Sequence, residues 1–260
     1  MKIAHFAKIL AGNNAVQISK ELIIFNDFEL YNLETGESKN YDSLEALLDD
    51  NAEAKRIIDE AEYFSLHFEG GRGSSSNTEK GKMGFAHAPN RGKDRTTDML
   101  NAELNFDTAK GNSLTAVLGR FKDKYGKADH EYGAVVDEQG FVHSLRNGNK
   151  HNVTYQPNTF DNMTIVHNHP GGGNFSDTDL ITAANTKAKG VIAMSSNTKN
   201  SGKTYHFQKN NNFKAKDFVK ALNKASWSEG LGYDRGASQW LRANQRKYGY
   251  KFSSTKLIGE

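Results

Sequence analysis

The chain has 260 residues, of which 36% are hydrophobic and 25% charged, with a net charge of +3 and a mean hydropathy of −0.73. This length can bury a proper core in one large domain or two small ones, and no apolar run approaches the roughly 18 residues of a membrane span. Zero cysteines exclude disulfides and thiolate ligands, so any transition-metal site must use histidine and carboxylate, which favours a catalytic site.

Residues 1–68 predict a small N-terminal α+β module. Within it, residues 21–33 and 34–41 have the character of a pair of β segments. Residues 42–61 carry apolar side chains at helical spacing, and Asp42 with Glu45 three positions later has the pattern of a capping box, so we expect one amphipathic helix there. The opening residues have too broken an apolar segment for a signal peptide, which favours a cytoplasmic location.

Residues 69–95 are rich in glycine, serine and lysine and show no sustained periodicity. Such a composition is typical of a flexible linker or an exposed loop. We therefore place the domain boundary in this segment.

Residues 96–212 predict an α/β (α+β) domain in which helices flank a mixed β-sheet. Apolar periodicity, turn residues and capping patterns each contribute to this prediction. In chain order, the expected elements are a helix over 113–126, two strands within 130–147 around a turn at 137–140, a strand over 162–169, a helix over 176–190, and strands over 191–196 and 203–208.

The last segment, 213–260, predicts a basic helical extension with helices over 213–227 and 235–249. Residues 180–260 hold 15 Lys+Arg against 4 Asp+Glu, a balance of +11, whereas residues 1–179 hold 19 against 27, a balance of −8. The extension is either a solvated lysine-rich helical surface or a contact for nucleic acid or an acidic protein partner. This extension mixes basic and aromatic side chains, which is compatible with contact to a nucleic-acid backbone and with stacking on bases. Trp240 and Leu241 also fit a hydrophobic core, because they lie at helical spacing. The residues of this mixture are Trp240, Arg242, Arg246, Lys247, Tyr248 and Tyr250.

The stretch IVHNHPGGGNFSDTDL, residues 165–180, carries the chemistry. Residues i and i+2 of a strand share a face, so His167 and His169 can grip zinc at two points. Asp179, in the first turn of the next helix, could supply an anionic third ligand, with water in the fourth position. The plainer alternative is a glycine-rich turn into a helix capped by Ser176 and Asp179. That alternative leaves the two histidines unexplained.

Hydrolysis of an amide also requires a base near the metal but outside its ligands. Glu131 precedes a predicted strand upstream of the histidines and is one choice. Spacing alone does not favour it over Asp129, Asp137 or Glu138.

The same residues resemble the JAB/MPN+ (JAMM) metallopeptidase signature, in which an upstream glutamate is followed by H-x-H-P, a short loop and S-x-x-D. The form HNHP is similar to that of RadC-type bacterial proteins, and EYGAVVDEQG resembles the first strand of the family. The resemblance covers about residues 114–210. It implies a cytidine-deaminase-like fold, Zn²⁺, and a protein or peptide substrate cleaved at a peptide or isopeptide bond. It also implies site roles: His167, His169 and Asp179 as zinc ligands, Glu131 as general acid/base, and Ser176 as an oxyanion donor.

The loop between the second histidine and the serine has six residues, 170–175, where the family pattern has seven. Such shorter loops resemble a JAB-type branch found in phage and mobile-element proteins, and they leave Asp177 as an alternative ligand to Asp179. One alternative function is a non-catalytic JAB-like binding module that uses the basic tail. Another is a processing unit within a phage structural protein. The consecutive letters HNH do not indicate an HNH nuclease, whose three residues are dispersed along the chain.

Overall fold

The computed structural model describes residues 2–19, 21–61, 66–69, 113–155, 161–195, 202–225 and 233–256. The predicted linker at 69–95 therefore lies outside the described residues, apart from Glu69. Three sheets are present in the described part, with four, six and two strands. No helix among the described residues is both long and apolar enough to cross a bilayer.

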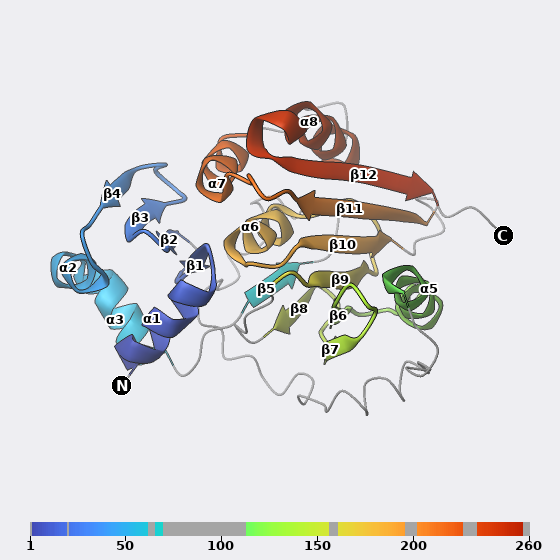
Figure 1. Ribbon diagram of the computed structural model, residues 1–260, viewed down its shortest axis with the longest axis horizontal. Helices are drawn as coiled ribbons and strands as arrows, with labels where there is room; N and C mark the ends of the chain where they lie inside the picture. The colour runs from blue at the N-terminus through green and yellow to red at the C-terminus, as the bar shows by residue number, and fades with distance from the viewer. Residues whose placement is uncertain are drawn as a thin grey trace.

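The N-terminal module is an antiparallel sheet of four strands in the order β1-β2-β3-β4, with three helices beside it (Figure 1). Ile24 and Leu30 of the sheet share a buried cluster with Phe6 and Leu47 of the helices. The elements are α1 (Lys2–Gly12), β1 (Ala15–Gln17), β2 (Leu22–Phe25), β3 (Glu29–Asn32), β4 (Ser38–Asn40), α2 (Leu44–Asp50) and α3 (Ala52–Glu60).

The prediction of one helix over 42–61 is wrong, because two helices, α2 and α3, meet at Asn51. The Asn51 side chain accepts a hydrogen bond from Ala54 N at 2.8 Å and so caps α3. The cap of α2 is Ser43 rather than Asp42, since Ser43 Oγ accepts from Ala46 N at 3.1 Å. The apolar spacing continues through the break, which explains why periodicity alone predicted a single helix.

The larger sheet has six strands in the order β12-β11-β10-β9-β6-β7. The pair β9–β10 is parallel and the other pairs are antiparallel, so the sheet is mixed, as predicted. Its strands are β6 (Tyr132–Val136), β7 (Val142–Asn147), β9 (Thr164–His169), β10 (Gly190–Ser195), β11 (Lys203–Lys209) and β12 (Tyr250–Lys256). The helices of this part of the chain are α5 (Leu114–Tyr125), α6 (Asp177–Asn185), α7 (Ala215–Asn223) and α8 (Tyr233–Tyr248). A two-stranded sheet joins β5 (Leu66–Glu69) to β8 (Asn152–Tyr155).

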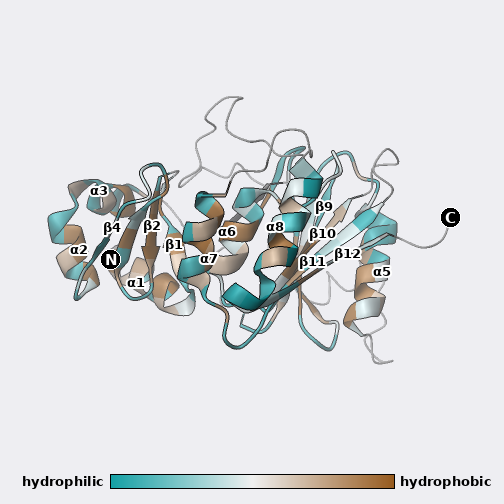
Figure 2. Ribbon diagram, turned by 90° about the horizontal axis from the view of Figure 1, so that it is seen from above, coloured by the Kyte–Doolittle hydropathy of each residue, from teal (hydrophilic) through white to brown (hydrophobic). Residues whose placement is uncertain are grey.

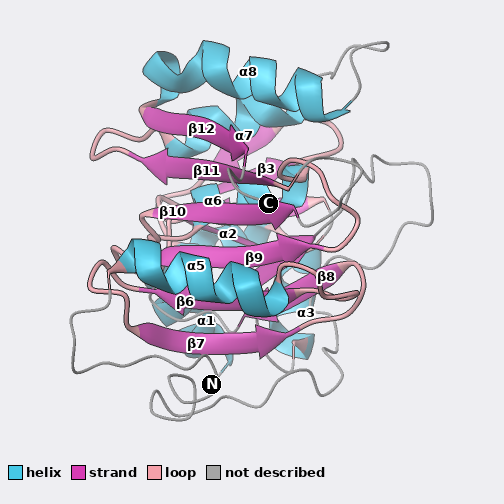
Figure 3. Cartoon of the chain, turned by 90° about the vertical axis from the view of Figure 1, so that its right-hand side faces the viewer, coloured by secondary structure: helices cyan, strands magenta, loops and turns pink. Residues whose placement is uncertain are grey.

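Helices cover both faces of the six-stranded sheet (Figure 3). On one face, Val117 and Phe121 of α5 share a cluster with Val166 and Ile192. On the other face, α6, α7 and α8 share the largest cluster, which includes Ile165 and Val191 of the central strands. Figure 2 shows hydrophilic and hydrophobic segments alternating along α7 and α8, as amphipathic helices on a core require. The predicted α/β architecture of a mixed sheet flanked by helices is therefore confirmed.

The N-terminal module contacts the ends of α6 and α7. Asn14 Nδ2 donates to the carbonyls of Ala184 and Thr186, both at 2.9 Å. Tyr31 and Phe25 of the module belong to the same buried cluster as α6 and α7. Residues 15–31 thus contribute to the core that holds the candidate site.

The C-terminal segment differs from the prediction of helices alone. Residues Tyr250–Lys256 form β12, which pairs with β11 and extends the central sheet. Tyr248 and Tyr250 are 5% and 2% exposed, and Tyr250 Oη donates to Leu241 O at 2.7 Å. Their rings belong to the core, so these two tyrosines do not present a free face for base stacking.

Candidate metal centre

The β9–α6–β10 crossover brings the candidate ligands together. Parallel strands require such a crossover, and here it places the start of α6 beside the end of β9. His167 and His169 share the face of β9 that packs against α6, together with Ile165 of the core. Asp179 lies in the first turn of α6 and meets them there. All three side chains are fully buried, at 0% exposure.

The ligand atoms of these residues converge. The Nε2 atoms of His167 and His169 are 2.8 Å apart. Asp179 Oδ1 lies 3.5 Å from His167 Nε2, and Asp179 Oδ2 lies 3.4 Å from His169 Nε2. Among the described residues, this is the one group of three or more His, Asp or Glu residues with metal-ligand spacing.

The arrangement fits a tetrahedral cation. Two ligands that are each about 2.0–2.1 Å from a tetrahedral ion lie about 3.3–3.4 Å apart. Both His–Asp distances match this spacing, and the His–His distance is about 0.5 Å short of it. Asp179 Oδ1 is buried and makes no hydrogen bond to any described residue. A cation would satisfy that oxygen, whose burial is otherwise costly.

The protonation states also fit a cation. His169 Nδ1 lies 3.3 Å from Gly173 O; because a carbonyl only accepts, Nδ1 donates, and Nε2 is the ring nitrogen that faces the site. Burial lowers the pKa of His167 and outweighs the opposing effect of Asp179. Burial alone would raise the pKa of Asp179, but the two imidazoles hold it well below its usual range. Neutral imidazole and ionised carboxylate are the forms that bind metals.

The loop between β9 and α6 is fixed by contacts from β10 and α8. Gly172 and Gly173 have φ of 72° and 114°, a region that favours glycine. Ser195 Oγ of β10 accepts from Gly173 N at 3.2 Å. From α8, Asp234 Oδ1 accepts from Asn174 N at 2.9 Å, and Ser238 Oγ accepts from Asn174 Nδ2 at 3.0 Å. Sequence reasoning missed these α8 residues, because a contact across 60 positions leaves no local pattern.

Ser176 is the N-cap of α6 and forms the predicted capping box with Asp179. Ser176 Oγ accepts from Asp179 N at 3.0 Å, and Asp179 Oδ2 accepts from Ser176 N at 2.8 Å. Asp177, the alternative ligand, is exposed and lies 3.4 Å from the hydroxyl of Tyr233. The structure therefore brings Asp179, and not Asp177, to the histidines. Asp179 serves both as helix cap and as neighbour of the histidines, so the two interpretations of this residue are compatible. The helix itself ends at Asn185, earlier than predicted.

Glu131 is the one of the four considered carboxylates that lies in the interior, at 0% exposure. In the β6–β9 register Gly133 faces His167, and extending it by two residues places Glu131 across from His169. Asn168, on the opposite face, clamps this edge: its Oδ1 accepts from Tyr132 N at 2.6 Å, and its Nδ2 donates to His130 O at 3.0 Å.

The other three carboxylates pair at the surface. Asp129 pairs with His130, Asp137 with His143, and Glu138 with Lys189. The fold thus distinguishes Glu131 from the three other carboxylates that spacing alone could not separate.

Tyr155 was not anticipated from the sequence. Its side chain is 1% exposed, and its hydroxyl donates to Val166 O at 3.1 Å. Burial raises its pKa well above the usual value, and the charges of Glu131 and Asp179 raise it further. Tyr155 therefore stays a neutral phenol beside both carboxylates, in the wall of the site.

Comparisons of the chain with protein-family models, curated proteins and solved structures found no match in any of the three. The function of the chain is therefore inferred from its motif and from the geometry of this centre.

Proposed function

We propose that this chain is a zinc-dependent hydrolase of the JAB/MPN (JAMM) type that cleaves a peptide or isopeptide bond. The observation that carries the proposal is the convergence of His167 Nε2, His169 Nε2 and the Asp179 carboxylate at distances of 2.8–3.5 Å. The mixed sheet with a parallel β9–α6–β10 crossover at the site is compatible with a JAB/MPN-like, cytidine-deaminase-like fold.

His167, His169 and Asp179 would hold the ion, leaving a fourth position for water or substrate. Zinc in such a site supplies a Lewis acid that polarises a carbonyl and lowers the pKa of water towards neutrality. Gly173 O orients His169 through Nδ1, and the capping box fixes the carboxylate of Asp179. Such outer contacts hold ligands in their productive geometry.

Glu131 would act as the general acid/base. Its buried carboxylate, on the same sheet face as the histidines, would take a proton from the attacking water and deliver it to the leaving nitrogen. Ser176 Oγ already accepts from Asp179 N, so its own O–H can donate to a developing oxyanion.

Metal content and hydrolysis, measured on the same preparations, test the proposal. Elemental analysis should find one zinc per chain in the wild type and in Glu131→Gln, and none in His169→Gln. His143→Gln, which alters a surface histidine paired with Asp137, is the matched control and should keep its zinc. Activity on a quenched-fluorescent peptide library and on an isopeptide-linked probe should fall about 10²–10⁴-fold in Glu131→Gln, the usual effect of losing a general base.

Absence of zinc in the wild type after reconstitution, or full activity in Glu131→Gln, would overturn the proposal.

A second function, a non-catalytic JAB-like binding module, is favoured by one observation: the three ligand side chains and Glu131 are all 0% exposed. A substrate must reach these atoms for hydrolysis, whereas a structural ion needs no access. Stoichiometric zinc together with absent hydrolysis in the wild type, and a loss of folded protein on chelation, would assign the chain to this second class.

A further inference from the structure

Three surface hollows share one loop, residues 209–214, which joins β11 to α7. Their volumes are about 370, 350 and 340 Å³. Asn210 lines the first two, and Lys214 lines the third. Lys214 N donates to Tyr248 O, and Asn210 N donates to Gly249 O, so the loop is held against the α8–β12 turn. The three hollows therefore lie around one loop that is fixed by backbone hydrogen bonds.

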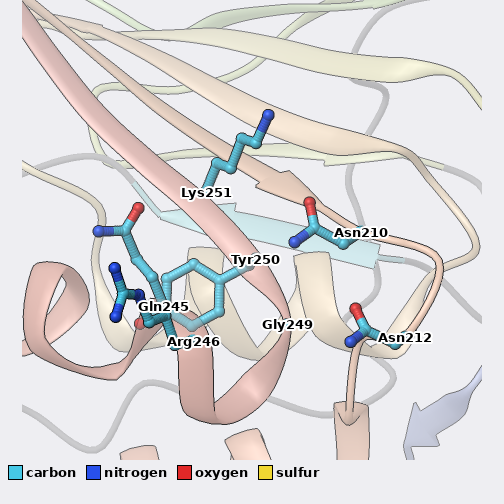
Figure 4. Close-up of a pocket in the computed structure, with 7 residues that line it drawn as sticks. All are labelled: Asn210, Asn212, Gln245, Arg246, Gly249, Tyr250 and Lys251. Carbon is cyan, nitrogen blue, oxygen red and sulfur yellow. The ribbon is translucent and has the colours of Figure 1, made fainter.

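The surface around this loop is strongly basic. Among the described residues that line the hollows, Asp217 is the one carboxylate. Figure 4 shows the first of these hollows, with Asn210 and Asn212 of the loop on one side and Arg246 of α8 and Tyr250 of β12 on the other. Nine of the described residues that line the three hollows are lysine or arginine.

Some of these cations already have partners within the chain. Lys189 pairs with Glu138, and Lys220 pairs with Glu29 at 2.5 Å. Lys209 Nζ donates to carbonyl groups at the end of α6. Lys187, which is exposed, donates to Ala11 O at 2.9 Å.

The remaining five cations are exposed and make no ion pair with any carboxylate in the described part of the chain: Lys214, Lys224, Arg246, Lys247 and Lys251. We call these five the basic surface.

The neighbouring groups indicate which polyanion fits. Asn210, Asn211 and Asn212 are exposed, and amides beside cations donate hydrogen bonds to phosphate and sugar oxygens. Of the aromatic residues that line the hollows, Tyr248 and Tyr250 are buried, and the half-buried ring of Phe213 packs against Phe207 and Phe218. These rings are held by the core and do not offer a free face to unpaired bases. The chemistry therefore matches a sugar–phosphate backbone whose bases are already paired.

We propose that the basic surface, with the 209–214 loop at its centre, binds the backbone of duplex nucleic acid without reading its sequence. The surface lies at the end of the central sheet opposite the candidate metal centre: Gly190 of β10 pairs with Gln208, next to the loop, whereas Ser195 pairs with His169. The six residues of β10 separate the two ends by about 17–20 Å. Binding here is independent of the proposed hydrolysis.

Fluorescence anisotropy with a labelled 20-base-pair DNA duplex, over a series of KCl concentrations, tests the proposal on the full chain. Each phosphate contact contributes about 0.9 to the slope of log affinity against log salt. The triple variant Lys214→Gln/Arg246→Gln/Lys251→Gln should reduce that slope by about 3 and weaken binding about tenfold or more at low salt.

The control variant Lys55→Gln/Lys122→Gln/Lys150→Gln removes the same net charge from other parts of the surface. It should bind like the wild type, and circular dichroism should show both triple variants folded.

The proposal is overturned if the wild type does not bind the duplex at about 50 mM KCl, because contacts to phosphate are strong at such low salt. It is also overturned if the two triple variants lose affinity equally, because bulk charge would then explain the binding. Tighter binding to phosphatidylserine vesicles than to DNA would assign the surface to a membrane instead. An unlabelled duplex of unrelated sequence should compete equally, and a strong sequence preference would contradict backbone recognition.

Discussion

Gly133 of β6 packs against the side chain of Tyr155. Adding one methyl group at this position therefore tests the packing around the candidate metal centre. A Cβ at this position would lie 1.8 Å from Tyr155 Oη, 2.7 Å from Tyr155 Cζ and 3.1 Å from Val153 Cγ2. Both side chains are buried, at 1% and 0% exposure, so neither can swing into solvent. Overpacking costs about 1–3 kcal/mol. Loss of the 3.1 Å hydrogen bond from Tyr155 to Val166 O adds about 1 kcal/mol.

We therefore expect Gly133→Ala to lower the free energy of unfolding by about 2–4 kcal/mol, measured by urea denaturation with an unchanged slope. Gly119→Ala is the matched control: among the described residues, no atom outside the adjacent backbone of its own helix lies within 4 Å of the added Cβ, and alanine favours the helix by about 0.8–1 kcal/mol. Adding Tyr155→Phe to Gly133→Ala removes the closest clash, so the double variant should cost less than the two single costs combined. A Gly133→Ala protein within about 0.5 kcal/mol of wild type, or fully additive costs, would refute the packing described here.

Two further predictions concern the centre, and a third concerns an ion pair of the N-terminal module. After chelation, zinc at 100 times its dissociation constant should stabilise the wild type by about 2.7 kcal/mol, a rise of about 5–11 °C in Tm, and should not stabilise His169→Gln. Asn174→Ala should weaken zinc binding about 10–100-fold in a competition assay with a chromophoric chelator, while Asn211→Ala, on an exposed residue, should not. Although burial opposes it, pairing with two lysines lowers the pKa of Glu29 from 4.5 to about 2. The stability that its carboxylate contributes should be complete above pH 4.5 and lost as the pH falls towards 2, and the wild type and Glu29→Gln should converge in acid denaturation. A constant difference between them across that range would contradict the pairing.

Local patterns predicted the parts of the centre that are determined locally. The alternation of a strand placed His167 and His169 on one face, and the S-x-x-D spacing predicted the capping box that holds Asp179. These features depend on residues within four positions of one another, so the sequence reports them directly. The roles in metal binding and catalysis stay predictions.

Three other features did not follow from these patterns. Asn51 interrupts a helical pattern whose apolar spacing continues unchanged, so periodicity did not reveal the break. Residues 250–256 extend the central sheet only because β11 offers them an edge. Glu131 is distinguished from Asp129 by burial, which the register of β6 against β9 determines and spacing does not.

The hydrogen bonds from α8 to the loop at residues 170–175 bear on when the metal centre can reach its final geometry during protein synthesis. The ribosome makes His167, His169 and Asp179 well before Asp234, which lies 60 positions after the loop residue that it holds. A growing chain therefore carries every ligand before it can fix the loop, and zinc captured at that time would be held weakly. A chain ending at residue 225 should bind zinc more weakly than the full chain, and equal affinity would show that the loop is ordered without α8.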